Sequence, residues 1–227
     1  MIAQWLRADG DGLLICLVYI VVVIGVAEGL RRWRGYGAGF TRKVIHIGVG
    51  MMIWLVPWVF EEPWVFMGCA VLFGFINLAD WYWGLLPAMA SEDEGNLGTV
   101  YFPWVAAVAV WWLWEWPPLL VAAIMPLTWG DGLASVVGRR WGRHAYYVRG
   151  HKRTWEGSGA FLVGTVLAVG AALWLVGGES VVVGVEVLLV AVVVGVVTAV
   201  TEAISLGGFD NITVTLVAIG ILTWWPF

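Results

Sequence analysis

Long apolar stretches separated by short polar breaks run through almost the whole chain. Between residues 181 and 200, for example, Glu186 is the single charged residue in a stretch dominated by valine. With 61% hydrophobic and 12% charged residues, the chain could not cover a water-facing surface of ordinary charge density. Crossing the hydrocarbon core of a bilayer takes roughly 20 mainly apolar residues in a helix. The sequence therefore predicts an all-α, polytopic membrane helix bundle.

The polar breaks set the number and limits of the expected spans. Clusters such as Glu61-Glu62-Pro63 and Trp116-Pro117-Pro118 mark these breaks. They leave room for about eight transmembrane helices, in a range of roughly seven to nine. Because no fixed-period repeat and no flexible linker is present, residues 1–227 are expected to form a single integral membrane domain. The expected helices are 12–30, 44–60, 64–86, 100–116, 118–136, 157–177, 181–201 and 210–225.

Positive charge is concentrated in two short segments. Five Lys and Arg residues lie within residues 31–43, six lie within residues 139–153, and Arg7 is the twelfth. If eight helices alternate across the bilayer, both segments emerge on one side, where they favour a small anionic partner. Because positively charged connections stay in the cytoplasm, the expected location is the cell membrane, with the catalytic loops cytoplasmic and both termini outside. A nucleic-acid partner is not expected.

Ionisable residues inside apolar stretches are costly in a membrane, so each one is expected to be paired, solvated or functional. Arg42 and Lys43 stand four and three residues before His46, which puts the three side chains on one helix face. Asn77 and Asp80 share a spacing of three near the end of another expected span. The structural alternative is that the cations anchor a helix at the interface, the imidazole bonds a neighbouring helix and the aspartate is interfacial.

Asp131 is the carboxylate that lies well inside an expected span. It stands between Gly130 and Gly132, which let a backbone or a ligand approach closely, and Ser135 follows one helical turn later. A carboxylate in this position usually needs a cation. The sequence leaves two candidates open, which are an arginine of a neighbouring helix and Mg²⁺ held through oxygen ligands.

The second basic segment has the composition of an anion-binding site. Lys152 and Arg153 can contact phosphate oxygens. Thr154 and Ser158 can donate hydroxyl hydrogen bonds where the next helix starts, and free N–H groups there add partial positive charge. As an alternative to an anion-binding site, this basic segment could serve only to orient the chain in the membrane. That alternative does not explain why Glu156 follows the basic residues. Since the chain has no Walker pattern, a different phosphate cradle is expected.

Polar residues also flank the turn before the last expected span. Glu202 precedes a Gly-Gly turn, and Asp210 and Asn211 follow it. Carboxylates in this arrangement can supply a metal ligand or orient a substrate hydroxyl, whereas Glu202 could equally pair with a basic segment. Thr99 and Tyr101 follow an acidic segment and place hydroxyl groups beside another helix start.

Taken in order, these motifs resemble the polyprenol kinase family, which includes dolichol kinase, phytol kinase and the CTP-dependent diacylglycerol kinase. The resemblance covers roughly residues 40–215. The family usually has Lys-Ser before x-Glu-Gly, whereas Arg153-Thr154 stands there in this chain and Lys152 lies one residue earlier, so either cation could meet the phosphate. The matching motifs are Arg42-Lys43-x-x-His46, Gly98-Thr99-x-Tyr101, Gly130-Asp131-x-x-Ala134-Ser135-x-x-Gly138, Glu156-Gly157-Ser158 and Glu202-Ala203-x-Ser205-x-x-x-x-Asp210-Asn211.

The resemblance implies phosphoryl transfer from a nucleoside triphosphate, typically CTP, to the hydroxyl of a long isoprenoid alcohol or another lipid. Such transfer needs mainly Mg²⁺ (or Mn²⁺), cations on the phosphates and alignment of the attacking oxygen. The resulting hypothesis assigns catalysis to Asp131, His46 and Glu202, and metal binding to Asp131, Glu202 and Asp210. The residues assigned to phosphate binding are Arg42, Lys43, Arg139, Lys152, Arg153, Thr154, Glu156 and Ser158. The residues assigned to substrate contacts are Asn77, Asp80, Thr99, Tyr101, Ser135 and Asn211.

Two other functions stay open on the sequence. A cytidylyltransferase would attack the α-phosphate of CTP with a lipid phosphate and release pyrophosphate, and the segment Lys152 to Gly157 also resembles a loop of the related CDP-diacylglycerol synthases. An anion transporter could use the basic segments to bind its solute, although transporters often show paired repeats and none is present here. Nothing in the pattern specifies an oligomeric state.

Overall fold

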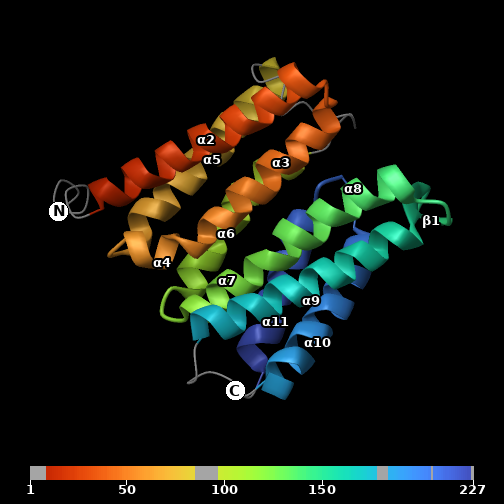
Figure 1. The fold of residues 1–227 in the computed structure, drawn as a ribbon. Helices are drawn as coiled ribbons and strands as arrows, with labels where there is room; N and C mark the ends of the chain where they lie inside the picture. The colour runs from red at the N-terminus through yellow and green to blue at the C-terminus, as the bar shows by residue number, and fades with distance from the viewer. Residues whose placement is uncertain (1–8, 85–96, 178–183, 206, 226–227) are drawn as a thin grey trace. The chain divides into compact units, whose positions relative to one another are not determined.

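The computed structural model describes residues 9–84, 97–177, 184–205 and 207–225. The chain forms two compact units, Met1–Trp114 and Glu115–Phe227, each built mainly of helices (Figure 1). Within the described residues, five helical segments are long and apolar enough to cross a membrane, and two more apolar helices are shorter. The expected all-α membrane bundle is therefore confirmed, and its being a single domain stays a prediction.

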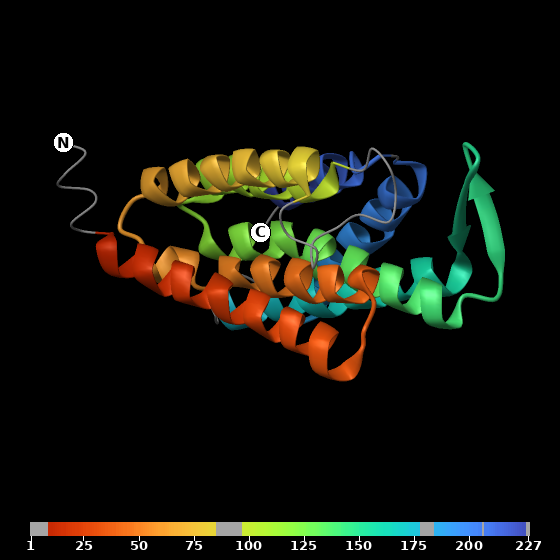
Figure 2. The same cartoon turned by 90° about the horizontal axis from the view of Figure 1, so that it is seen from above.

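Unit 1 pairs its helices two by two. Helix α2 packs against α3, and α5 packs against α6 (Figure 2). The expected helix 44–60 starts earlier and is broken in the middle, because Pro57 lacks the N–H that would continue the hydrogen-bond pattern. The elements are α2 (Gly10–Arg34), α3 (Ala38–Met51), a 3-10 turn (Met52–Trp54), α4 (Val56–Val59), α5 (Pro63–Trp83) and α6 (Gly98–Leu113).

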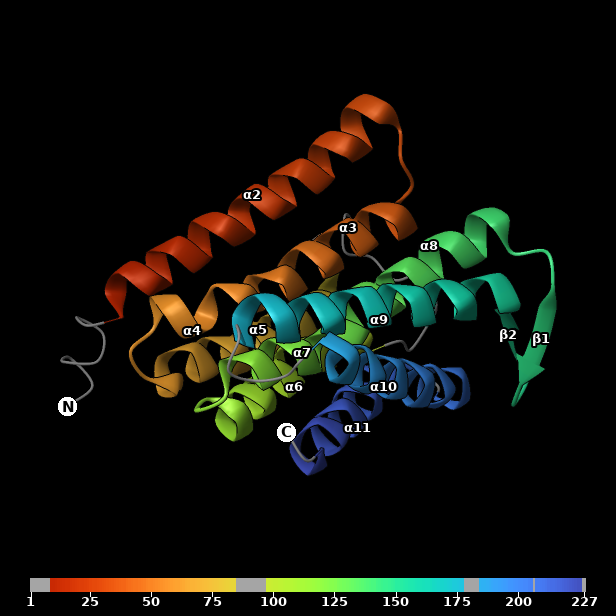
Figure 3. The ribbon, with the colours of Figure 1, turned by 60° about the horizontal axis from the view of Figure 1, so that its bottom comes forward.

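Unit 2 is organised around one long helix, α9. It packs against α7, α8 and α10 (Figure 3). Its Phe161 and Leu173 side chains are fully buried. The fifth expected span runs on to residue 141 and contains a π-helical turn. The elements are α7 (Pro117–Met125), the π-helical turn (Pro126–Asp131), α8 (Gly132–Trp141), β1 (Ala145–Val148), β2 (His151–Thr154), α9 (Trp155–Gly177), α10 (Gly184–Ile204) and α11 (Asp210–Trp224).

A two-stranded antiparallel hairpin stands between α8 and α9, where the sequence suggested only a basic loop. Arg149 and Gly150 form its turn, with φ values of 48° and 84°. Two positive φ values are what the type I′ turn of a two-residue hairpin requires. The prediction of a loop was wrong here because strands of four residues are too short to show a clear period of two.

Helix α9 approaches its neighbours closely at glycine residues. A Cβ on Gly157 would lie only 3.1 Å from the carbonyl oxygen of Ala134, and a Cβ on Gly130 would collide with the hydroxyl of Thr165. Small residues are what allows membrane helices to pack this tightly. Gly130 was expected to admit either a backbone or a ligand, and the structure shows the close approach of another helix.

Two alanine substitutions on α9 should separate this packing effect from helix propensity. Gly157→Ala should lower the apparent unfolding temperature in detergent by several degrees, because overpacking costs about 1–3 kcal/mol. Gly159→Ala is the matched control, since a Cβ there meets nothing within 4 Å. It should leave the unfolding temperature unchanged or raise it slightly, as alanine favours a helix by up to about 1 kcal/mol over glycine. Equal unfolding temperatures would contradict the packing role.

Candidate functional site

Asp131 ends the π-helical turn inside the candidate membrane span Pro117–Trp141. It is 8% exposed. Widened helical turns of this kind occur frequently at functional sites, and a carboxylate in a membrane segment is costly unless it is used. The prediction that Asp131 lies well inside a span is confirmed, and its buried position makes it the strongest candidate for chemistry in unit 2.

The hairpin places the two cations that were predicted to bind phosphate on opposite faces. Arg153 is paired with Tyr146 and is partly buried, whereas Lys152 is paired with Tyr147 and is exposed. Successive residues of a strand point to opposite faces, so one side chain faces the helices and the other faces away. The pleat therefore gives two neighbouring residues different surroundings.

Arg153 holds the hairpin against the end of α10. Its Nη1 lies 2.5 Å from Oε1 of Glu202, and its Nη2 donates hydrogen bonds to the carbonyl oxygens of Glu202 (3.3 Å) and Ser205 (3.1 Å). Glu202 is only 3% exposed. A guanidinium bound to the last carbonyls of a helix also interacts favourably with the helix dipole. The expected pairing of Glu202 with a basic segment is therefore observed, and its metal-binding role stays a prediction.

Thr154 caps the first turn of α9. Its Oγ1 accepts a hydrogen bond from the N–H of Gly157 at 3.1 Å, and the N–H of Trp155 donates to the carbonyl oxygen of His144 at 3.0 Å. Threonine in this position is a common N-cap. Two of the N–H groups that were expected to attract an anion thus bind protein atoms instead.

Glu156 and Ser158 also connect α9 to the hairpin and to His144, the residue just before β1. A carboxylate oxygen of Glu156 lies 2.6 Å from Nδ1 of His144, and the hydroxyl of Ser158 lies 2.6 Å from that of Tyr146. His144 and Tyr146 were not among the residues predicted from the sequence, since their contacts depend on the hairpin. Because strands of four residues show no clear alternation, the sequence carried no signal for these contacts.

The remaining residues predicted in unit 2 occupy helix ends and turns. Arg139 is exposed in the last turn of α8, and Ser135 is partly buried one turn before it. Asp210 starts α11, where its Oδ1 accepts a hydrogen bond from the N–H of Asn211 at 3.1 Å. A carboxylate is favourable at a helix N-terminus. These positions suit either capping or ligand contact.

The described residues contain no group of three His, Cys, Asp or Glu side chains that could hold a metal. Mg²⁺ in nucleotide sites is usually held by one or two carboxylates together with phosphate oxygens, so such a group is not required. The buried carboxylate of Asp131 fits that simpler mode. Metal binding by Asp131, Glu202 and Asp210 stays a prediction.

In unit 1, the predicted basic face lies on α3. The His46 ring packs against Phe102 of α6, with 4.9 Å between ring centroids. Lys43 is buried and Arg42 is partly buried. The imidazole therefore packs against a neighbouring helix, and its catalytic role and the phosphate-binding roles of the two cations stay predictions.

The polar residues of α5 and α6 meet at one end of this helix pair. Nδ2 of Asn77 donates a hydrogen bond to the carbonyl oxygen of Thr99 at 2.8 Å, and Asn77 is 4% exposed. Tyr101 follows two residues after Thr99 in the first turn of α6, and the partly buried Asp80 is one turn after Asn77 on α5. The structure thus brings together two residues that the sequence assigned separately to the substrate.

The Arg153–Glu202 pair can be tested by comparing adjacent cations. Arg153→Gln should reduce stability by roughly 2–4 kcal/mol, because it removes the guanidinium from a buried carboxylate, whereas Lys152→Gln should change stability little. Thermal unfolding in detergent measures both. Adding Glu202→Gln to Arg153→Gln should recover part of the loss, since the charge is then removed as well. Equal losses in the two single variants would refute the pairing.

Comparisons with known proteins agree with the motif order. The chain is 32% identical over 200 residues to the phytol kinase of Synechocystis sp., covering 87% of this chain and 84% of that protein. It is 25% identical over 207 residues to "Probable phytol kinase 3, chloroplastic" of Glycine max, covering 79% of this chain and 60% of that protein. No protein-family profile and no solved structure matches it. The chain belongs to the polyprenol kinase family, the group that includes the phytol kinases.

Proposed function

We propose that this protein is a membrane lipid kinase that transfers the terminal phosphoryl group of CTP to the hydroxyl of a long-chain isoprenoid alcohol of the phytol, geranylgeraniol or dolichol type. The observation that carries this proposal is the 32% identity to a phytol kinase along most of both chains. Five helical segments able to cross a membrane suit a lipid substrate. The order of the motifs supports CTP as the donor, and the positive charge of the connections supports a cytoplasmic catalytic face.

Asp131 is the proposed centre of the chemistry. It holds Mg²⁺ (or Mn²⁺) or activates the lipid hydroxyl, with Glu202 and Asp210 as further metal ligands. The metal, when bound, supplies positive charge for the phosphate oxygens. His46 is the alternative general base, because an imidazole titrates near neutral pH.

Replacing the Asp131 carboxylate should abolish turnover without unfolding the protein. Asp131→Asn keeps the shape of the side chain and removes its charge, so the unfolding temperature should stay near that of the wild type. Glu186→Gln is the control, because Glu186 is exposed in the first turn of α10 and the variant makes the same kind of change. The assay uses labelled CTP, Mg²⁺ and a panel of phytol, geranylgeraniol, dolichol and diacylglycerol. Activity of Asp131→Asn at the wild-type level would refute the assignment.

The same assay, run in parallel with a lipid phosphate as acceptor, identifies the reaction class by its products. A kinase gives CDP and a lipid phosphate, whereas a cytidylyltransferase acting on a lipid phosphate gives pyrophosphate and a CDP-lipid. Uptake of an anionic solute with no nucleotide turnover would instead indicate a transporter. We expect CDP and the phosphate of an isoprenoid alcohol.

Lys152 is the cation that we assign to the nucleotide phosphates, since Arg153 is bound to Glu202 and to carbonyl oxygens. Lys152→Ala should raise the KM for CTP by about tenfold, the effect of losing one hydrogen bond between charged groups. Arg149→Ala removes an equal charge from the neighbouring turn and should change the KM far less. Steady-state kinetics over a range of CTP concentrations measures both, and equal effects would indicate that only the overall charge matters.

A further inference from the structure

Glu156 carries the wrong charge for a residue beside a phosphate. The second basic segment contains six Lys and Arg residues, and Glu156 follows them in the first turn of α9. A carboxylate without a partner would repel a phosphate group, because two like charges close together raise the free energy of binding. In the structure this carboxylate has a partner, which is His144.

The carboxylate of Glu156 fixes the orientation of the His144 ring. Both of its oxygens accept a hydrogen bond from the backbone N–H of His144 at 3.2 Å, and Oε1 lies 2.6 Å from Nδ1. Because an ionised carboxylate can only accept, Nδ1 carries a proton in this pair. The same arrangement sets the tautomer of functional imidazoles in many sites. The His144 side chain is 77% exposed, so its second nitrogen, Nε2, is accessible to a ligand.

The connection between the hairpin and α9 does not depend on the imidazole. The carbonyl oxygen of His144 accepts a hydrogen bond from the N–H of Trp155 at 3.0 Å, and its own N–H donates to Glu156. Both bonds use backbone groups, which any residue except proline supplies. The ring is thus exposed and held in one orientation without being needed for the backbone contacts. Functional side chains are held in this way when a site is preorganised.

The surroundings of His144 favour an anionic ligand. Arg143 is its exposed neighbour in the chain, and Arg139 and Arg140 are exposed in the last turn of α8. Lys152 is exposed on β2. All of these residues belong to unit 2, and the local excess of cations raises the concentration of anions at this end of the unit.

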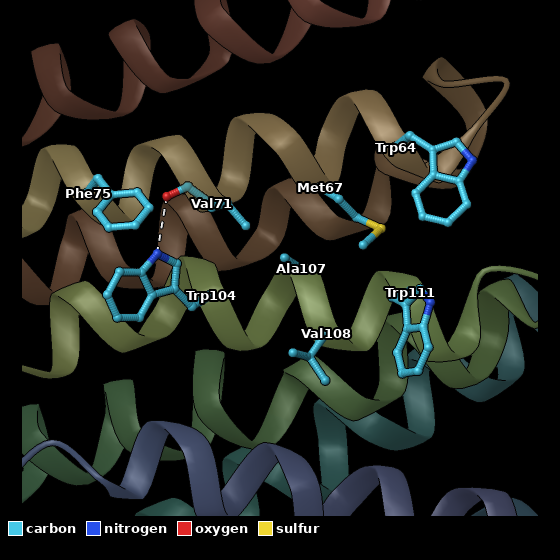
Figure 4. Close-up of a pocket in the computed structure, with 8 residues that line it drawn as sticks. All are labelled: Trp64, Met67, Val71, Phe75, Trp104, Ala107, Val108 and Trp111. Carbon is cyan, nitrogen blue, oxygen red and sulfur yellow. Dashed lines mark hydrogen bonds between the residues drawn. The ribbon is translucent and has the colours of Figure 1, made fainter.

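Unit 1 contains a groove of the opposite character, with a volume of about 640 Å³ along α5 and α6 (Figure 4). Its only lining atom with a printed bond is the indole N–H of Trp104, which donates to the carbonyl oxygen of Val71 at 3.1 Å. No lining residue carries a charge, so this groove has no cation to offer a phosphate. The lining residues are Trp64, Met67, Val71, Phe75, Trp104, Ala107, Val108 and Trp111.

We propose that His144 is a phosphate-binding residue that Glu156 positions, and that its Nε2–H donates a hydrogen bond to a phosphate oxygen of the nucleoside triphosphate. The proposal rests on the proposed function and adds a nucleotide contact to it. A protonated imidazole has two N–H donors, of which Glu156 takes one and the phosphate takes the other. Hydrogen bonds between charged groups are short and strong. The positive ring also neutralises Glu156, which accounts for a carboxylate beside a phosphate.

Chemical footprinting tests this contact independently of turnover. Diethyl pyrocarbonate acylates accessible imidazole nitrogens, and His151 on β2 is an exposed control in the same hairpin. The full-length protein in phosphatidylcholine nanodiscs is treated with and without CTP and Mg²⁺, and mass spectrometry measures the labelling of each histidine. We expect CTP to suppress the labelling of His144 and to leave that of His151 unchanged. Equal protection of both histidines, or of neither, would overturn the proposal.

An anionic lipid headgroup presents the same phosphate chemistry, so a second arm uses nanodiscs that contain phosphatidylglycerol and no CTP. We expect His144 to be labelled as fast there as in phosphatidylcholine alone. Protection by phosphatidylglycerol without protection by CTP would assign the site to a lipid headgroup and overturn its assignment to the nucleotide.

Kinetics of matched variants test whether Glu156 acts through the ring. His144→Gln should raise the KM for CTP by about tenfold with little change in kcat, the effect of losing one hydrogen bond between charged groups. His151→Gln should leave both constants near wild type. Glu156→Gln should also raise this KM, but it should add nothing in the His144→Gln background, because the two residues act as one unit. Independent, additive effects would contradict the positioning role.

Footprinting and turnover together separate this contact from the lipid kinase function. If CTP protects His144 but no alcohol is phosphorylated, the proposed function fails and the phosphate contact stands. If alcohols are phosphorylated while CTP leaves the labelling of His144 unchanged, the contact fails and the function stands.

Discussion

Hydrocarbon offers no hydrogen-bond partner, and this constraint governs where polar groups lie in both units. The hydroxyls of Thr128 and Thr198 donate to carbonyl oxygens of their own helices, at 2.9 Å and 2.5 Å. The carboxylate of Glu202 is bound by Arg153 from the hairpin.

The hairpin places neighbouring cations of the second basic segment, which carries six Lys and Arg residues, in different surroundings. It turns Arg153 toward the end of α10 and leaves Lys152 exposed, so two adjacent cations have different surroundings. Its connection to α9 is fixed by the Thr154 cap and by the contact between Glu156 and His144. Several residues of the family-like motif thus shape the site through contacts with other protein groups.

The glycines of the same motifs act in a similar way. Gly130 and Gly157 allow α9 to pack closely beside the helical segment that carries Asp131. The π-helical turn then ends at Asp131 in the interior of unit 2. The glycines of these motifs therefore serve helix packing in this chain.

The sequence by itself determined the membrane class, most helix limits and the deep position of Asp131, because apolar length and breaks are local properties of the chain. Tertiary structure alone decided the pairing of Arg153 with Glu202, since 49 residues separate them. It likewise decided the hairpin register, the contact of His46 with Phe102 and the groove along α5 and α6. These features depend on which side chains of different elements meet, and that geometry has no signature in a linear pattern.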